Sequence, residues 1–288
     1  MSRPGSVAVI VSTYNQPAHL ARCLRALERQ SHQDFELLLA DDGSGAETRA
    51  LIAATADRFG GRLRHLWQDD DGFRKTRILN RAILETRAEY LVFMDGDCVA
   101  HPDFLREHLR AAAPGQYLNG AMIRLTPKQT GAVNADNIDS GEIFDSKWLT
   151  RSAGRWNRRY LKLSLPYGLR AWLNDHSTTN LYWLGANSSC YRADAEAANG
   201  FDNRFGYGFE DGDFGNRLEN LGLRPATVRW TANVLHLDHG RPYRDAARER
   251  RQWELMATKG PGGRVRCPDG LDELRERLGV EDPTAARG

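Results

Sequence analysis

The first third of the chain alternates between short apolar runs and amphipathic segments, and this alternation constrains the fold more than any other feature of the sequence. Apolar runs cover residues 7–11, 35–40, 63–67 and 90–94, and a segment with helical spacing follows each of the first three. Strands that alternate with helices in this way form a parallel sheet with helices on both faces. The sequence therefore predicts an α/β fold with a Rossmann-like, mostly parallel sheet.

The expected helices follow from apolar spacing. Leu20, Cys23, Leu24 and Leu27 mark one helical face, and Pro17 suits the first turn of that helix. Further helices are expected at about residues 47–59 and around 78–84. Ligands of such sheets bind beyond the carboxyl ends of the strands, which is where Tyr14, Asp42, Asp95 and Asp97 all fall.

Asp95 and Asp97 follow the strand YLVFM and are separated by one glycine. Side chains at i and i+2 of an extended chain point to one side, so both carboxylates can face one ligand. Paired carboxylates repel each other unless a cation compensates them, and hard oxygen ligands suit Mg²⁺ or Mn²⁺. The alternative is an ordinary Asp-Gly turn without a ligand.

A second acidic cluster lies in the segment FGYGFEDGDFGNRL, residues 205–218. Glu210, Asp211 and Asp213 stand at or just before a helix expected over residues 212–221. Favourable interaction with the helix N-terminus explains one such acid more readily than three. The aromatic residues in front of them suit packing against a sugar ring or against the core.

Composition excludes several classes of protein. A chain of 288 residues with 41% hydrophobic residues supports one large domain, and a net charge of +2 gives no bulk electrostatic case for nucleic acid. No apolar run is long enough to span a bilayer, and the N-terminus enters a strand too early for a signal peptide, so we expect a cytoplasmic protein. The four cysteines form no CxxC pair and are expected to be buried or incidental thiols.

Taken together, these segments resemble the inverting nucleotide-sugar glycosyltransferases of family 2, which have the GT-A fold. VIVSTYNQPAHLARCLRALERQ resembles the first strand and helix of that family, LLLADDGS its second strand and turn, and FMDGD its DxD motif. DDDGFRKTRILNRAI is similar to the segment before the DxD strand, and NSSCYRADAEAANGFDNRFGYGFEDGDFGNRL to the acceptor-side region of galactosyltransferase-like and chondroitin-polymerase-like enzymes. The resemblance covers about residues 6–240.

The resemblance implies a donor site. Its residues would be Ser12, Tyr14, Asp42, Arg74, Arg77 and Asp95. Asp42 would accept a hydrogen bond from the nucleotide base, and the two arginines would lie near the base or the diphosphate, although arginine on an exposed helix face is also ordinary. Asn187 either hydrogen-bonds the donor sugar or holds a loop.

The resemblance also implies a site for Mn²⁺ or Mg²⁺. Asp97 would ligate the metal directly and Asp95 would contact the ribose or the metal shell. The third ligand is expected at the end of the strand in residues 233–237, where His236 stands and His239 competes with it.

For the chemistry, the resemblance implies that Asp211 takes the proton of the acceptor hydroxyl and that Glu210 orients the acceptor. Asp213 would lie near the acceptor or cap the helix. Tyr207 stands where the family more usually has the tryptophan of a GWG motif, and it can still stack on a sugar. A single displacement would invert the configuration of the sugar.

Residues 126–180 match no motif of the family and form a variable insert within an expected catalytic domain of residues 1–240. Within the insert, residues 147–172 interleave basic and aromatic side chains, which suits either an anionic membrane surface or a helical flap over the acceptor cleft. Residues 241–288 are expected to form charged C-terminal helices, which could pack on the catalytic domain, mediate oligomers or anchor the protein to a complex.

The sequence therefore predicts a metal-dependent inverting glycosyltransferase. It would move a sugar from a nucleotide donor, expected to be UDP-linked, to a hydroxyl of a glycan or lipid-linked saccharide. The usual role of the family suggests surface polysaccharide or lipopolysaccharide synthesis, in the cytoplasm or at the inner face of the membrane. The alternatives are a nucleotidyltransferase, against which the absence of a glycine-rich phosphate loop argues, and a non-catalytic carbohydrate-binding protein of the same fold.

Overall fold

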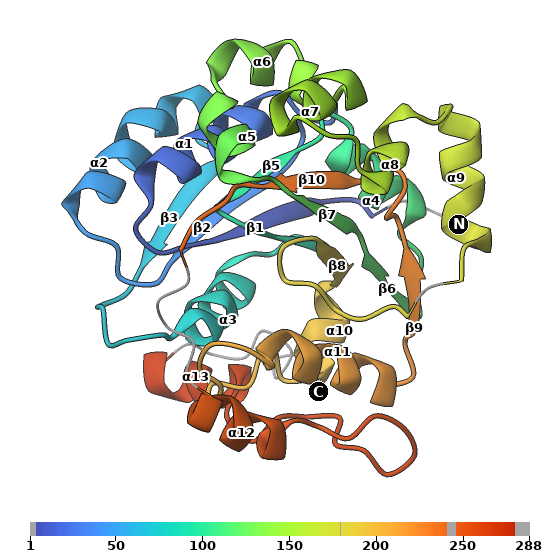
Figure 1. Cartoon of the computed structure of the whole chain (residues 1–288). Helices are drawn as coiled ribbons and strands as arrows, with labels where there is room; N and C mark the ends of the chain where they lie inside the picture. The colour runs from blue at the N-terminus through green and yellow to red at the C-terminus, as the bar shows by residue number, and fades with distance from the viewer. Residues whose placement is uncertain (1–3, 179, 241–245, 280–288) are drawn as a thin grey trace.

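A computed structural model of the chain describes residues 4–178, 180–240 and 246–279 (Figure 1). Its main sheet has seven strands in the order β3-β2-β1-β4-β8-β6-β9. The first four, β1 (Val7–Thr13), β2 (Glu36–Asp41), β3 (Leu63–Trp67) and β4 (Tyr90–Asp95), are parallel to one another. The predicted parallel sheet is therefore confirmed in this half of the molecule.

Helices cover both faces of these strands. α1 (Pro17–Glu28) and α2 (Ala46–Thr55) pack on one face, where Leu20 and Leu24 contact the core formed by alternate residues of β1. α3 (Lys75–Glu85) packs on the other face, where Ile78 and Ala82 meet the intervening residues of β1. Because both faces of β1 are covered, every residue of the strand is buried, as its continuous apolar sequence requires.

The second half of the main sheet is mixed. β8 (Ser188–Tyr191) is antiparallel to both β4 and β6 (Gln116–Asn119), and β9 (Arg224–Thr227) is parallel to β6 at the edge. α4 (Phe104–Ala111) precedes β6, and α10 (Arg192–Ala197) and α11 (Glu210–Asn220) follow β8. The predicted acidic helix is thus present, and it begins at Glu210.

A second sheet has three strands, β5 (Cys98–Ala100), β10 (Asn233–His236) and β7 (Ala121–Arg124), with β10 in the middle. β5 begins directly after the DGD segment and pairs antiparallel with β10, so that His236 stands opposite Cys98. This register brings a histidine from near residue 240 to within a few residues of the DxD motif.

The insert is helical and packs on this second sheet (Figure 1). Its elements are α5 (Pro127–Ala132), α6 (Ala135–Asp139), α7 (Ser146–Ala153), α8 (Leu161–Ser164), α9 (Tyr167–His176) and the 3₁₀ turns Glu142–Phe144 and Arg158–Tyr160. Trp148, Leu149 and Tyr160 are buried together with apolar residues of β5, β7 and β10. Part of the insert is therefore an integral layer of the fold.

The C-terminal helices α12 (Ala246–Leu255) and α13 (Leu271–Leu278) pack beneath α3 and α11 in Figure 1. Leu271 lies fully buried in the same core as α3, so the predicted helices pack on the catalytic region. All four cysteines are buried and free. Within the described ranges, every helix is too short or too polar to cross a membrane.

Candidate active site

The carboxyl ends of β1 and β4 lie side by side because Ser12 is in register with Asp95. The Ser12 hydroxyl donates to Asp95 Oδ1 at 2.7 Å, and the Lys75 ammonium at the start of α3 lies 2.7 Å from the same oxygen. Gly96 passes close to β1, since a Cβ there would come within 3.0 Å of the Ser12 carbonyl oxygen. The glycine of the DGD motif therefore allows β4 to turn against β1 at this point.

Asp97 forms a compact group with two histidines from the end of β10 and the loop after it. His239 Nε2 lies 2.8 Å and His236 Nε2 lies 3.5 Å from Asp97 Oδ2, and one ligand atom from each residue lies within 4.8 Å of the others. Burial would raise the pKa of Asp97, but the His239 hydrogen bond and the two imidazoles hold it below its usual value. Both competing histidines belong to this group, whereas Asp95 is not a member of it.

Asp42, at the end of β2, is almost completely buried. Its Oδ2 accepts from the Arg74 backbone N–H at 2.9 Å and its Oδ1 from Gln68 Nε2 at 2.6 Å. Burial raises the pKa of Asp42 to about 6 against the effect of these two hydrogen bonds. A carboxylate has about four acceptor positions, so two donors leave capacity for a third.

The loop after β1 has an unusual backbone. Asn15 and Gln16 are both left-handed, with φ of 53° and 57°, a conformation that costs of order 1 kcal/mol or more per non-glycine residue. Hydrogen bonds hold the loop to the turn after β2, since the Asn15 backbone N–H donates to Ser44 Oγ at 2.7 Å. The Tyr14 side chain in this loop is half-exposed, and its hydroxyl donates to Asp70 at 2.9 Å.

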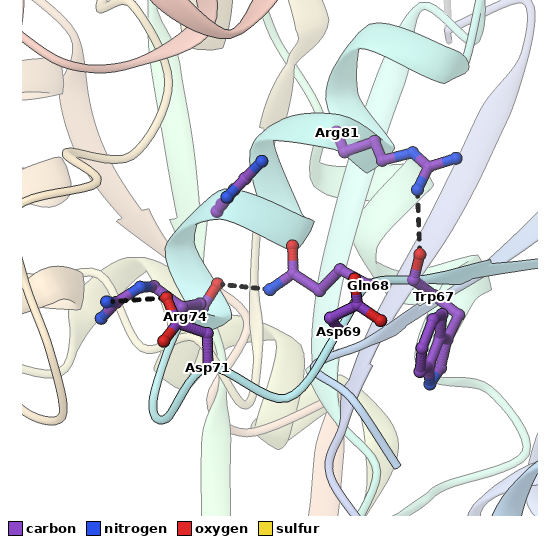
Figure 2. A pocket seen from close by; sticks show the side chains of 7 residues that line it. Trp67, Gln68, Asp69, Asp71, Arg74 and Arg81 are labelled. Atoms are coloured by element: carbon purple, nitrogen blue, oxygen red, sulfur yellow. Dashed lines mark hydrogen bonds and ion pairs between the residues drawn. The ribbon is translucent and has the colours of Figure 1, made fainter. Parts of the chain in front are cut away.

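A pocket of about 440 Å³ opens beside Asp42, between the β3–α3 loop and the outer face of α3. Figure 2 shows Arg74 paired with Asp71, and Arg81 donating to the carbonyl oxygen of Trp67. Arg77 lies between these two arginines along the helix and lines the same pocket. The predicted donor arginines are thus gathered at the edge of the sheet, on the side of Asp42 rather than of Asp95.

The acidic cluster at the start of α11 comes from the second half of the chain. Phe209, just before it, has a left-handed backbone with φ of 68°. Asp211 Oδ2 accepts from the Gly185 N–H at 2.9 Å, and a side chain at Gly185 would collide with that carboxylate. The other oxygen of Asp211 and Oε2 of Glu210 are buried without a hydrogen-bond partner, which marks them as groups prepared for a ligand.

These two carboxyls perturb each other. Burial and the neighbouring Asp211 raise the pKa of Glu210 to about 8, while the positive charge of Lys75 acts against them. Burial also raises the pKa of Asp211, and Lys75 is the main influence that lowers it. Lys75 is thus the cation shared by the donor-side Asp95 and the acidic pair. Sequence reasoning missed Lys75, because the alternation of basic residues in GFRKTR does not show which of them turns inward.

The structure does not bring Asn187 to this site. Its side chain is completely buried, and its amide donates to the carbonyl oxygens of Ala121 at 2.9 Å and Ala232 at 3.0 Å. His108 Nε2 lies 2.9 Å from the amide oxygen. Of its two expected roles, the structure gives Asn187 the one in which it holds a loop, here between the two sheets.

Asp213, expected near the acceptor or as a helix cap, is held by partners inside the protein. It is completely buried, pairs with Arg217 Nε at 2.7 Å and Arg264 Nη2 at 3.0 Å, and accepts from the Ala257 N–H at 2.8 Å. The carboxylate thus attaches α11 to the C-terminal segment. Tyr207, in contrast, is partly exposed, and its ring contacts that of Phe73 with centroids 5.6 Å apart.

Solved structures with the same fold are similar to most of this chain. A mannosyltransferase from Pyrobaculum calidifontis, solved with GDP-Man and Mn²⁺, matches with a TM-score of 0.56 and 18% identity over 84% of this chain and 59% of that one. TarS from S. aureus in complex with UDP matches with a TM-score of 0.53 and 16% identity over 80% of this chain and 60% of that one. The chain therefore has the GT-A fold of nucleotide-sugar glycosyltransferases.

Within that class, the chain belongs to glycosyl transferase family 2, whose model matches residues 8–168. A model for the N-terminal domain of galactosyltransferase matches residues 177–240, so the resemblance seen on the acceptor side is confirmed. Both models end before α12, and neither covers the C-terminal helices.

Among curated relatives, a validoxylamine A glucosyltransferase from Streptomyces hygroscopicus subsp. jinggangensis is 29% identical over 248 residues, which are 82% of this chain and 56% of the relative. The putative glycosyltransferase EpsH of Bacillus subtilis is 29% identical over 107 residues, 37% of this chain and 30% of that protein. The chain spans about half the length of the validoxylamine A glucosyltransferases that it matches.

Proposed function

We propose that this chain is a metal-dependent, inverting hexosyltransferase that moves a sugar from a UDP-linked donor to a hydroxyl of a glycan or lipid-linked saccharide. The observation that carries the proposal is the arrangement around Lys75. A donor-side carboxylate, Asp95, and a buried acidic pair with unpartnered oxygens, Glu210 and Asp211, share this one cation. This arrangement places a proton acceptor close to where the sugar end of a nucleotide-sugar donor would lie.

The group Asp97, His236 and His239 fits a divalent cation. Its ligand atoms already converge within 4.8 Å, and two imidazoles with one carboxylate suit Mn²⁺ better than Mg²⁺, which prefers oxygen ligands. When bound, the cation would neutralise charge on a leaving diphosphate. The Pyrobaculum mannosyltransferase, which has the same fold, was solved with Mn²⁺, and this supports the choice of metal.

In the proposed reaction, Asp211 accepts the proton of the attacking hydroxyl and Glu210 binds the acceptor. The raised pKa of Asp211 makes this carboxylate a stronger base than an exposed aspartate, and Lys75 keeps it ionised. The hydroxyl attacks the anomeric carbon, the bond from that carbon to the diphosphate oxygen breaks, and the proton passes to Asp211. A single displacement of this kind inverts the anomeric configuration.

The preference for uridine rests on Asp42. Its buried carboxylate has spare acceptor capacity at the end of β2 and has no donor to offer, so it suits the N3–H of uracil. TarS, which has the same fold, binds UDP, whereas the Pyrobaculum enzyme binds GDP-Man. The Asp42 carboxylate is therefore the reason for proposing UDP rather than GDP.

The decisive experiment titrates UDP- and GDP-linked sugars into the protein with and without Mn²⁺ and follows the heat of binding and the release of nucleoside diphosphate. We expect one UDP-sugar to bind with Mn²⁺ and to be consumed when an acceptor is present. Asp211→Asn should reduce transfer by roughly 100-fold or more with donor affinity unchanged. Transfer retained by that variant would remove Asp211 as the base.

The biological setting is proposed from relatives. EpsH of Bacillus subtilis and the amylovoran biosynthesis glycosyltransferase AmsB of Erwinia amylovora each match about a third of the chain. The second is named for amylovoran biosynthesis, and on this likeness we propose a role in surface polysaccharide synthesis at the inner face of the membrane. Retention of a complete carboxylate and histidine set argues against a non-catalytic carbohydrate-binding protein.

A further inference from the structure

Trp253, on the C-terminal helix α12, is an exposed tryptophan beside the acidic cluster. It is 61% exposed, although large aromatic side chains are usually mostly buried. The residue before it, Gln252, is buried and donates to the Tyr207 carbonyl oxygen at 3.2 Å. Further along the chain, the Met256 sulfur lies against Gly212 in the first turn of α11. α12 is therefore fixed against the loop that carries Glu210 and Asp211.

The neighbours of Trp253 are also aromatic. The Phe209 ring lies 5.5 Å from the Trp253 ring at an angle of 77°, an edge-to-face contact. Tyr207, from the same loop as Phe209, forms a second edge-to-face pair with Phe73 of the β3–α3 loop. An edge-to-face contact occupies at most one face of either ring, so this contact leaves at least one face of the Trp253 ring free, and 61% of the side chain is exposed.

Two carboxylates lie next to this aromatic surface. Phe209 directly precedes Glu210, which is buried with only 7% of its surface exposed. Glu210 Oε2 and Asp211 Oδ1 have no hydrogen-bond partner. Phe209 has a left-handed backbone with φ of 68°, and strained backbone of this kind clusters at ligand-binding sites. Flat apolar faces bordered by hydroxyl acceptors are what a pyranose ring requires.

We propose that Trp253 and Phe209 form a platform on which a sugar ring of the acceptor stacks, with Glu210 binding one of its hydroxyls. The proposal rests on the proposed function, since it assigns the acceptor as a saccharide. It also assigns a binding role to a residue of the C-terminal segment, which lies beyond both family models. The acceptor subsite would then be partly built by a part of the chain that neither family model covers.

The test measures transfer kinetics with the UDP-sugar identified by the donor panel, Mn²⁺ and a set of acceptor probes. The probes are methyl β-glycosides of glucose, galactose, mannose and N-acetylglucosamine, together with cellobiose and lactose. Binding of each probe in the presence of UDP and Mn²⁺ is followed independently by saturation-transfer NMR. The variants are Trp253→Ala and Trp253→Phe, and the matched control is Leu278→Ala, because Leu278 is a large apolar side chain, 46% exposed, on the other C-terminal helix α13.

We expect Trp253→Ala to raise the acceptor KM about tenfold and to abolish the NMR signal of the probe, with the donor KM unchanged. Trp253→Phe should recover most of the affinity, and Leu278→Ala should behave like the unmodified protein. Since Trp253 is exposed, the melting temperature should stay the same in all variants.

Unchanged acceptor affinity in Trp253→Ala would overturn the platform. The platform would also be overturned if the unmodified protein released UDP from its donor but neither bound nor used any of the saccharides. That result would leave the proposed donor chemistry in place. If no nucleotide sugar bound at all, the proposed function itself would fail, and the platform with it.

Discussion

At the scale of single residues, the site depends on one cation, the Lys75 ammonium, which interacts with several carboxylates. Lys75 contacts Asp95 directly, and its charge lowers the pKa values of Glu210 and Asp211, which burial raises. Burial alone would lower the pKa of Lys75 itself, but the three carboxylates raise it, so the ammonium is charged. Asp211, the proposed base, and Asp95, the proposed donor-side carboxylate, are thus electrostatically linked through one side chain.

Removal of that charge should change the pH dependence of transfer. A base with a raised pKa loses activity as the pH falls through that pKa, and Lys75 is what limits the rise for Asp211. In Lys75→Met the acidic limb of kcat/KM should therefore move upward by about one pH unit or more, and Lys75→Arg should partly restore its position. If the acidic limb of kcat/KM kept its position in Lys75→Met and only the rate fell, this electrostatic role would be contradicted.

Asp42 gives a second pH-dependent prediction. Its pKa is raised to about 6, so the carboxylate should become protonated and lose its ability to accept from uracil as the pH falls through this value. Uridine, which has no phosphate to titrate, should bind progressively more weakly below that pH. Asp42→Asn should weaken binding by about 1.5–3 kcal/mol and abolish the pH dependence, as measured by calorimetry.

Asp69→Asn, an exposed change in the adjoining pocket, is the control for Asp42→Asn and should leave uridine binding unchanged. Equal pH dependence in the Asp42→Asn variant and the unmodified protein would show that another group titrates.

The sequence could predict which residue types gather at the carboxyl ends of the strands, since strand ends are visible as breaks in apolar runs. It could not predict the direction of polar side chains on helices. Asp213 and Asp211 are two positions apart on α11, yet one pairs with Arg217 inside the protein while the other faces Gly185. Helix geometry turns such residues to nearly opposite sides, but which side is the interior depends on distant partners, Arg264 for Asp213 and Gly185 for Asp211.

At the scale of elements, α11 is held in place by buried charges. Asp213 and Arg217 are both completely inaccessible, and Arg264 from the C-terminal segment completes the network. The first part of the fold was predictable because period-two and helical patterns fix it locally. The antiparallel β8 and the second sheet were not, because their pairing joins segments about a hundred residues apart.

Disruption of this network should destabilise the protein strongly. Asp213→Ala leaves the Arg217 charge buried without its partner, which costs about 3–5 kcal/mol. We expect a corresponding loss in the free energy of unfolding in urea, whereas Asp175→Ala, at an exposed aspartate on α9, should change it by less than about 0.5 kcal/mol. A loss below about 1 kcal/mol for Asp213→Ala would show that water or rearrangement compensates Arg217.

At the scale of the whole molecule, positive charge is distributed unevenly. Residues 147–172 carry seven basic and no acidic side chains, although the net charge of the chain is only +2. Trp156, Tyr167 and Trp172 are exposed within the same segment. α9 contacts Thr231 just before β10 begins, whereas His236 stands at the end of β10. α9 thus lies at the opposite end of that strand from the group Asp97, His236 and His239.

We therefore expect the basic surface to bind anionic membranes. Vesicles that contain phosphatidylglycerol should bind the protein at low salt and release it at high salt, whereas vesicles of phosphatidylcholine alone should not bind it. Each basic residue near such a surface contributes about 1 kcal/mol, so neutralising four exposed arginines should weaken binding by more than about 100-fold. The four changes are to glutamine at Arg151, Arg155, Arg158 and Arg159.

A matched control separates the local surface from overall charge. Changing exposed arginines elsewhere to glutamine alters the net charge equally and should leave vesicle binding within about threefold of the unmodified protein; these are Arg49, Arg58, Arg87 and Arg277. Transfer to a soluble acceptor should be the same in both variants, because neither changes the carboxylates or histidines of the site. If the two variants lost vesicle binding equally, the attraction would be a property of net charge. If neither lost it, residues 147–172 would be a solvated helical layer whose arginines serve only solubility.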